Sequence, residues 1–133
     1  MKINLNDPNP PVKFHFEEDN PDVGFVLLRR MNASEAQRIR KLCSQKQAPV
    51  FHRGQMYDPP EKVDDERQAT LHWDYVIAGW EGLQDGNGDD IPCTTEMKRK
   101  LILESPQFLG FITEKIEKLE LLNKDYRDES LKN

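Results

Sequence analysis

The sequence predicts an α+β fold that is mainly helical, in which an N-terminal antiparallel β-hairpin packs against about four helices. Three observations predict this class. Residues 12–16 alternate between apolar and polar side chains, which is the period of a strand. From residue 33 onward, apolar residues recur at helical spacing behind residues that favour helix N-caps. A chain of 133 residues is also long enough for one hydrophobic core and is expected to form one domain.

The predicted hairpin begins with the strand over residues 12–16. The apolar residues of this strand share one face: Val12, Phe14 and Phe16. Residues 23–28 are the second strand candidate, and residues 17–22 between them are rich in Glu, Asp, Asn and Pro. Because these residue types favour turns, the two strands are expected to pair with each other.

The first helix is predicted over residues 33–46. Asn32 is its expected N-cap, and Glu35 stands three residues later, where a capping-box acid belongs. Residues 48–63 contain Gly and Pro and show little periodicity, so they are expected to form a long loop with a short strand at Val50–Phe51.

The second helix is expected to start at Asp64 or Asp65 and to continue through Trp80, until the Asp, Gly and Asn residues of segment 85–90 stop it. Its apolar residues fall on one helical stripe, which is the strongest core signal in the sequence. These residues are Ala69, His72, Trp73, Val76, Ile77 and Trp80.

Two further helices are predicted towards the C-terminus. One is capped by Thr94 or Thr95 and runs to about Leu103, and the other starts after Ser105 at Pro106. The apolar stripe of the last helix contains Phe108, Phe111, Ile112, Ile116, Leu119 and Leu122. We therefore expect one globular domain over residues 1–126 and a charged, disordered tail over residues 127–133.

Composition excludes several classes of function. The net charge is −5 and the runs of Lys and Arg are short, so a nucleic acid is not an expected partner. The sequence contains no secretory signal and no apolar run of the roughly 20 residues that cross a bilayer, so a cytoplasmic protein without membrane contact is expected. Cys43 and Cys93 are expected to be reduced thiols.

A calcium-loop pattern lies between the second and third predicted helices. Its positions 1, 3, 5 and 12 are filled by Asp85, Asn87, Asp89 and Glu96. However, position 6, which requires Gly, is Asp90, and position 8 is Pro92, which has no N–H to donate. We therefore interpret the segment as a structural turn, and a calcium-binding module as an alternative that a calcium titration tests.

The sequence offers little for catalysis. His15, His52 and His72 are far apart and lack zinc-site spacing, and neither a phosphate-binding glycine loop nor a nucleophile elbow is present. We expect a non-enzymatic protein without a cofactor. The large aromatic residues on apolar stripes are the partner-binding candidates: Trp73, Trp80, Phe108 and Phe111. If these side chains are buried, the binding surface is expected around Phe51 and Tyr57 instead.

The segment from Trp73 to Leu119 resembles the small tail assembly chaperones and tail components of long-tailed bacteriophages and prophages. The shared pattern is a Trp-x-Gly helix end, an Asp/Gly turn, a Pro-x-Thr-x-Glu helix start and a proline-started final helix. The matching positions are Trp80, Gly82, Leu83, Asp85, Gly88, Ile91, Pro92, Cys93, Thr94 and Glu96.

The resemblance implies a non-enzymatic assembly chaperone in the cytoplasm of the host bacterial cell. It would bind the tape-measure protein or the tail-tube subunits and would be absent from the finished particle. Self-association would suit a chaperone that coats a long partner. The alternative within the same setting is a structural tail-completion or head–tail joining subunit, which would be retained in the virion.

Overall fold

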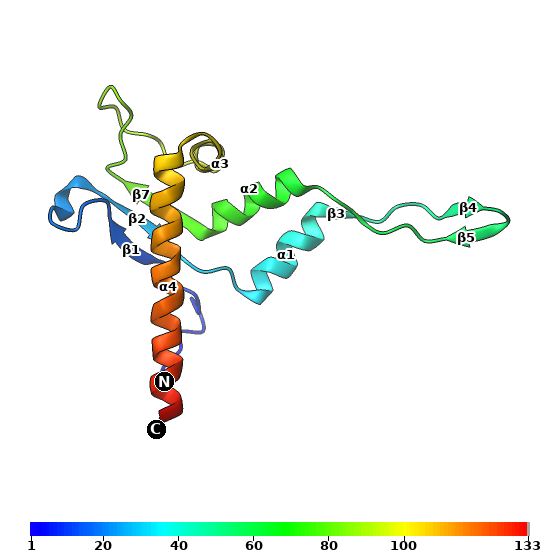
Figure 1. Cartoon of the computed structure of the whole chain (residues 1–133), viewed down its shortest axis with the longest axis horizontal. Coiled ribbons are helices and arrows are strands. Elements are labelled where there is room, and N and C mark those ends of the chain that lie inside the picture. Colours follow the sequence, from blue (N-terminus) through cyan, green and yellow to red (C-terminus); the bar gives the residue numbers. More distant parts are fainter. Residues whose placement is uncertain (133) are drawn as a thin grey trace.

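The computed structural model describes the backbone of residues 1–132 and the side chains of residues 1–122. Its main sheet has the strand order β1-β2-β7, and both strand pairs are antiparallel (Figure 1). The sheet is built by β1 (Val12–His15), β2 (Phe25–Leu28) and β7 (Ile77–Glu81), with the short 3₁₀ helix η1 (Pro21–Val23) in the β1–β2 connection. The four helices are α1 (Ala33–Cys43), α2 (Asp65–Val76), α3 (Thr95–Glu104) and α4 (Pro106–Lys132). The predicted α+β class with an N-terminal antiparallel hairpin is therefore confirmed.

The hydrophobic core lies between the sheet and the helix α4. Phe14, Val26 and Trp80 oppose one another across the three strands, so their side chains share one face of the sheet. Figure 1 shows α4 crossing the sheet. The buried residues of the core are Val26, Leu28, Ile77, Trp80, Ile102, Phe108, Ile112 and Leu119.

The predicted helix starts are confirmed by side-chain hydrogen bonds. The side chains of Asn32, Asp64 and Thr94 each accept a hydrogen bond from the backbone N–H three residues later, as N-caps do. The hydroxyl of Ser105 likewise accepts a hydrogen bond of 3.2 Å from the N–H of Phe108. These bonds satisfy backbone donors that have no partner within their own helix.

The prediction that the second helix continues through Trp80 is wrong. The helix α2 ends at Val76, and the chain passes directly into β7, which pairs with β2. Consequently Trp73 and Trp80 do not lie on one helix face. The β-branched pair Val76–Ile77 and the following Gly79 favour the strand, and β7 satisfies the backbone groups along the second edge of β2.

The predicted loop over residues 48–63 instead forms most of a β-ribbon. The strands β3 (Ser44–Gln45) and β6 (Lys62–Val63) pair at its base, and β4 (Val50–His52) and β5 (Gln55–Tyr57) pair at its tip. We call residues 44–63 the arm. Figure 1 shows that it projects from the ends of α1 and α2, far from the core.

The long helix α4 extends past the domain core in Figure 1. Its backbone is helical to Lys132, so its last turns overlap the predicted tail of residues 127–133. The side chains beyond residue 122 and the residue Asn133 lie outside the described part, and the domain limits stay a prediction. In the part of the chain that the structure describes, no helix combines the length and the apolar character that crossing a membrane requires.

Candidate protein-binding surfaces

Two of the predicted binding aromatics are core residues. Trp80 and Phe108 are each 7% exposed, and their rings meet edge to face with centroids 5.9 Å apart. The indole N–H of Trp80 donates a hydrogen bond of 2.8 Å to the carbonyl of Ile91. This bond ties the turn after β7 to the core. Both rings face the core and offer no exposed docking surface, and their role as partner-binding residues stays a prediction.

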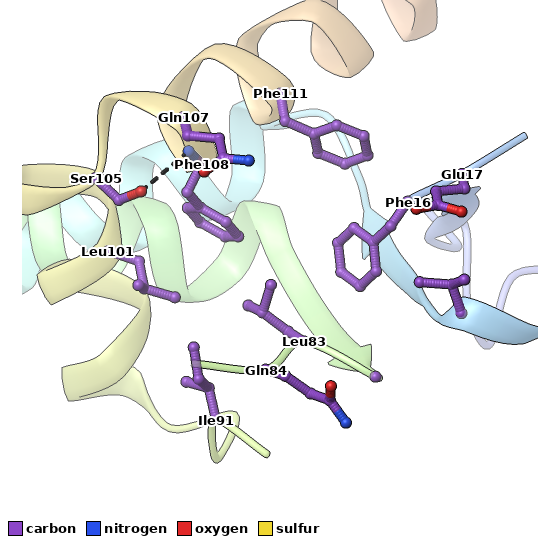
Figure 2. A pocket seen from close by; sticks show the side chains of 12 residues that line it. Phe16, Glu17, Leu83, Gln84, Ile91, Leu101, Ser105, Gln107, Phe108 and Phe111 are labelled. Carbon is purple, nitrogen blue, oxygen red and sulfur yellow. Dashed lines mark hydrogen bonds between the residues drawn. The ribbon is translucent and has the colours of Figure 1, made fainter. Parts of the chain in front are cut away.

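Phe111, the third candidate, is half-buried and lines a hollow of about 390 Å³ that Figure 2 shows from close by. We call this hollow the Phe111 groove. The ring centroids of Phe16 and Phe111 lie 5.5 Å apart. Phe16 directly follows β1, and Phe111 belongs to α4. The groove is lined by Phe16, Glu17, Val23, Gly82, Leu83, Gln84, Ile91, Leu101, Ser105, Gln107, Phe108 and Phe111.

The fourth candidate, Trp73, lines a second hollow of about 420 Å³ between α2 and α4. Its ring is half-buried and meets that of His72 edge to face at 5.0 Å. Burial lowers the pKa of His72, so this imidazole is neutral at pH 7. Four charged residues also line the hollow: Arg29, Arg30, Glu117 and Glu120. The surface around Trp73 is therefore mixed rather than apolar.

Among the described side chains of the helices and strands, the most exposed large apolar one is in the arm. Phe51 is 70% exposed, and the other three at the tip, Val50, Met56 and Tyr57, are each at least half exposed. Phe51 pairs directly with Met56, and Val50 pairs with Tyr57. Since directly opposed residues share a face and successive residues alternate, each face of the tip carries one apolar pair.

The backbone conformation of the turn at Arg53–Gly54 allows the arm to form a hairpin. Arg53 and Gly54 both have positive φ angles, 52° and 75°, as the two central residues of a type I′ turn require. The ribbon has only two strands, so each strand of the tip leaves one edge without a strand partner among the described residues. Two-stranded hairpins are marginally stable in water. The arm therefore combines exposed apolar faces with open strand edges, and both are features of protein-binding elements.

The candidate calcium segment is a closed turn. One carboxylate oxygen of Asp85 accepts hydrogen bonds from the backbone N–H groups of Asn87 and Asp89, at 2.9 and 3.1 Å. Glu96 lies in the first turn of α3. Within residues 1–122, no three His, Cys, Asp or Glu side chains are gathered as a metal site would require. The hydrogen bonds of Asp85 close the turn, and the calcium-binding alternative stays a prediction for the titration to test.

An ion pair between the buried Lys98 and the partly exposed Asp74 joins α2 to α3. Lys98 is 7% exposed, and its ammonium group donates hydrogen bonds to a side-chain oxygen and to the carbonyl of Asp74, at 3.1 and 3.2 Å. The hydroxyl of Thr95 donates another bond of 2.8 Å to the same carboxylate. Every donor of this cluster points at Asp74, so it holds the two helices together.

This cluster predicts an acid-sensitive stability. Burial raises the pKa of Asp74, but the hydrogen bonds from Thr95 and Lys98, together with the charges of Lys98 and Arg29, outweigh it and lower the pKa below the usual value. A lowered folded-state pKa contributes stability above the unfolded-state pKa, and that contribution is lost as pH falls through the folded-state pKa. We expect Asp74→Asn to lower the melting temperature at neutral pH and to flatten its fall below about pH 4. The exposed Asp19→Asn is the control. Identical pH profiles for the Asp74 variant and the wild type would contradict the assignment.

Sequence reasoning named Phe51 and Tyr57 only as a fallback and missed their partners Val50 and Met56. The available signal was the run Val50 to Tyr57, in which two apolar stretches flank the two-residue turn Arg53–Gly54. Arg is not a residue that predicts a type I′ turn, so this signal is weak.

Residues 29–133 match the family described as YdaY prophage protein. The match begins immediately after β2 and includes the arm, β7 and all four helices. Neither a curated protein nor a solved structure matches the chain.

Proposed function

Because this chain belongs to the YdaY prophage protein family, we propose that it acts in phage assembly as a non-enzymatic protein that binds another protein. More specifically, it is a tail assembly chaperone made in the cytoplasm of the host cell. Its partner is the tape-measure protein or a tail-tube subunit. The resemblance of the segment from Trp80 to Glu96 to small tail assembly chaperones supports this choice of process.

The observation that carries the proposal is the apolar tip of the arm. Two apolar pairs, Val50 with Tyr57 and Phe51 with Met56, are exposed on a ribbon that projects away from the core. Burying such side chains against a partner is favourable by about 25 cal/mol per Å² of apolar surface. A long helical chain that exposes apolar stripes until a tube encloses it is a partner of matching chemistry.

The perturbed titratable groups support a non-enzymatic role. Among the described residues, the side chains with a clearly shifted pKa are Glu35, Arg38, His72, Asp74 and Lys118. Four of them are partners in ion pairs, and the pKa of His72 is lowered by burial alone. Catalytic sites usually bring perturbed groups together in one cleft.

The rival within the same process is a structural subunit that stays in the virion. Purified particles separate the two, because a chaperone is absent from them and a structural subunit is present in fixed stoichiometry.

A pull-down tests the proposal. The tagged chain is purified from host cells after induction of the prophage, and the co-purifying chains are identified by mass spectrometry. We expect a tape-measure chain or a tail-tube subunit, and these chains should be lacking from a pull-down with the tag alone. Recovery of neither chain would reject the chaperone role.

A further inference from the structure

We propose that the arm tip of one copy inserts its Phe51–Met56 face into the Phe111 groove of a second copy, so that the protein associates head to tail. The inference shares the arm with the proposed function. It nevertheless concerns the purified chain alone, so its test does not depend on any phage partner.

The groove is a hollow beside the hydrophobic core, and its lining combines apolar side chains with polar ones such as Glu17 and Gln107. Its floor consists of half-buried or buried apolar side chains, among them Leu83, Leu101 and Phe108, which belong to the core or pack against it (Figure 2). A hollow of about 390 Å³ lies within the size range of pockets that bind apolar groups. The apolar floor of the groove therefore offers a contact surface for large apolar side chains.

The charged side chain among the residues that line the groove is a carboxylate, that of Glu17. An occupant that combines apolar side chains with positive charge is the best electrostatic match for such a site.

The arm tip has this chemistry. Residues 50–57 contain Arg53 and no carboxylate. The exposed pair of Phe51 and Met56 stands within three residues of Arg53, so an inserted tip would bring the guanidinium towards Glu17. The arm tip therefore complements the groove in two ways: Arg53 is opposite in charge to Glu17, and the apolar pair matches the apolar floor.

The arrangement of the two elements fixes the mode of association. Figure 1 shows the arm on the opposite side of the molecule from β7, α3 and the start of α4, which build the groove. The arm is too distant to reach its own groove, so its partner groove belongs to another copy. A contact between two different surfaces is heterologous, and it continues from copy to copy unless the rotation closes a ring.

Only one face of the tip is used by this contact. The opposite face, with Val50 and Tyr57, remains open to a phage partner. A row of copies joined in this way would present a repeated series of binding faces, which suits a long partner chain.

Sedimentation velocity of the purified full-length chain tests the inference. We expect the weight-average sedimentation coefficient of the wild type to rise with concentration above that of a 15.5 kDa monomer. Phe51→Ser with Met56→Ser should weaken association at least about tenfold. Val50→Ser with Tyr57→Ser is the matched control, because it removes two apolar side chains from the other face, and it should associate like the wild type. Unchanged melting temperatures establish that both variants fold.

A charge exchange tests the orientation of the contact. Arg53→Glu alone and Glu17→Arg alone should each weaken association several-fold, whereas an equimolar mixture of the two variants should associate like the wild type, since each arm then meets a groove of opposite charge. A wild type that stays monomeric at every concentration, or a mixture as weak as its components, would overturn the inference. The pull-down result is independent of both outcomes.

Discussion

Replacing Gly82 by alanine is expected to cost at least about 4 kcal/mol of folding free energy, or to prevent folding. An added Cβ would lie 2.8 Å from the Cα of Gly24 and still closer to the carbonyl oxygen of Val23. Both obstacles are backbone atoms, which cannot rotate away as a side chain can. Gly82 also has a φ angle of +74°, a conformation that L-residues rarely adopt. Urea denaturation followed by circular dichroism measures the loss.

A matched glycine separates the two causes. Gly88 has a similar φ angle of +81°, but an added Cβ would meet nothing within 4 Å. Gly88→Ala should therefore cost only the backbone strain, about 1 kcal/mol. If the Gly82 and Gly88 variants lost equal stability, the close approach of the η1–β2 and β7 backbones would not be a determinant of the fold.

Replacing Trp80 by alanine is expected to cost about 3–5 kcal/mol. The change removes a buried ring from the core face of the edge strand β7, together with its edge-to-face contact with Phe108, and it leaves the carbonyl of Ile91 without the indole N–H. Thermal and urea denaturation measure the effect. Phe51→Ala is the control, because that ring is 70% exposed and contributes little to the isolated chain. Comparable losses in the two variants would contradict the described core.

Local chemistry explains which parts of the fold were predictable. The period of Val12, Phe14 and Phe16 predicted β1, and short polar residues predicted the starts of α1, at Asn32, and of α2, at Asp64 or Asp65. These signals reside within a few neighbouring residues. They do not depend on what the element later packs against, so the sequence alone is sufficient to read them.

β7 was missed because a bulge imitates the helical period. Ile77 pairs with Leu28 and Gly79 pairs with Leu27, so Ala78 is an extra residue in β7. Ile77 and Trp80 consequently share the core face although they are three residues apart, a spacing that otherwise indicates a helix. The bulge depends on pairing with β2, and that long-range contact has no local signature.

The binding surface was harder to predict than the core. The spacing of apolar residues is the same whether their face meets the core or a partner. The sequence therefore provided no reason to prefer Trp73 and Phe111 over Trp80 and Phe108 as binding candidates. Only the tertiary structure separates the two buried rings from the exposed arm.

The central claim is that the arm binds a phage assembly protein, and a shortened arm tests it most directly. Because Gln45 and Lys62 oppose each other in the β3–β6 pair, an Asn-Gly turn can replace residues 46–61 and close the ribbon at its base. The wild-type and shortened chains are compared in the same pull-down from induced host cells. We predict that the shortened chain keeps its melting temperature and loses the tape-measure or tail-tube partner. Recovery of the same partner in the same amount by both chains would contradict the claim.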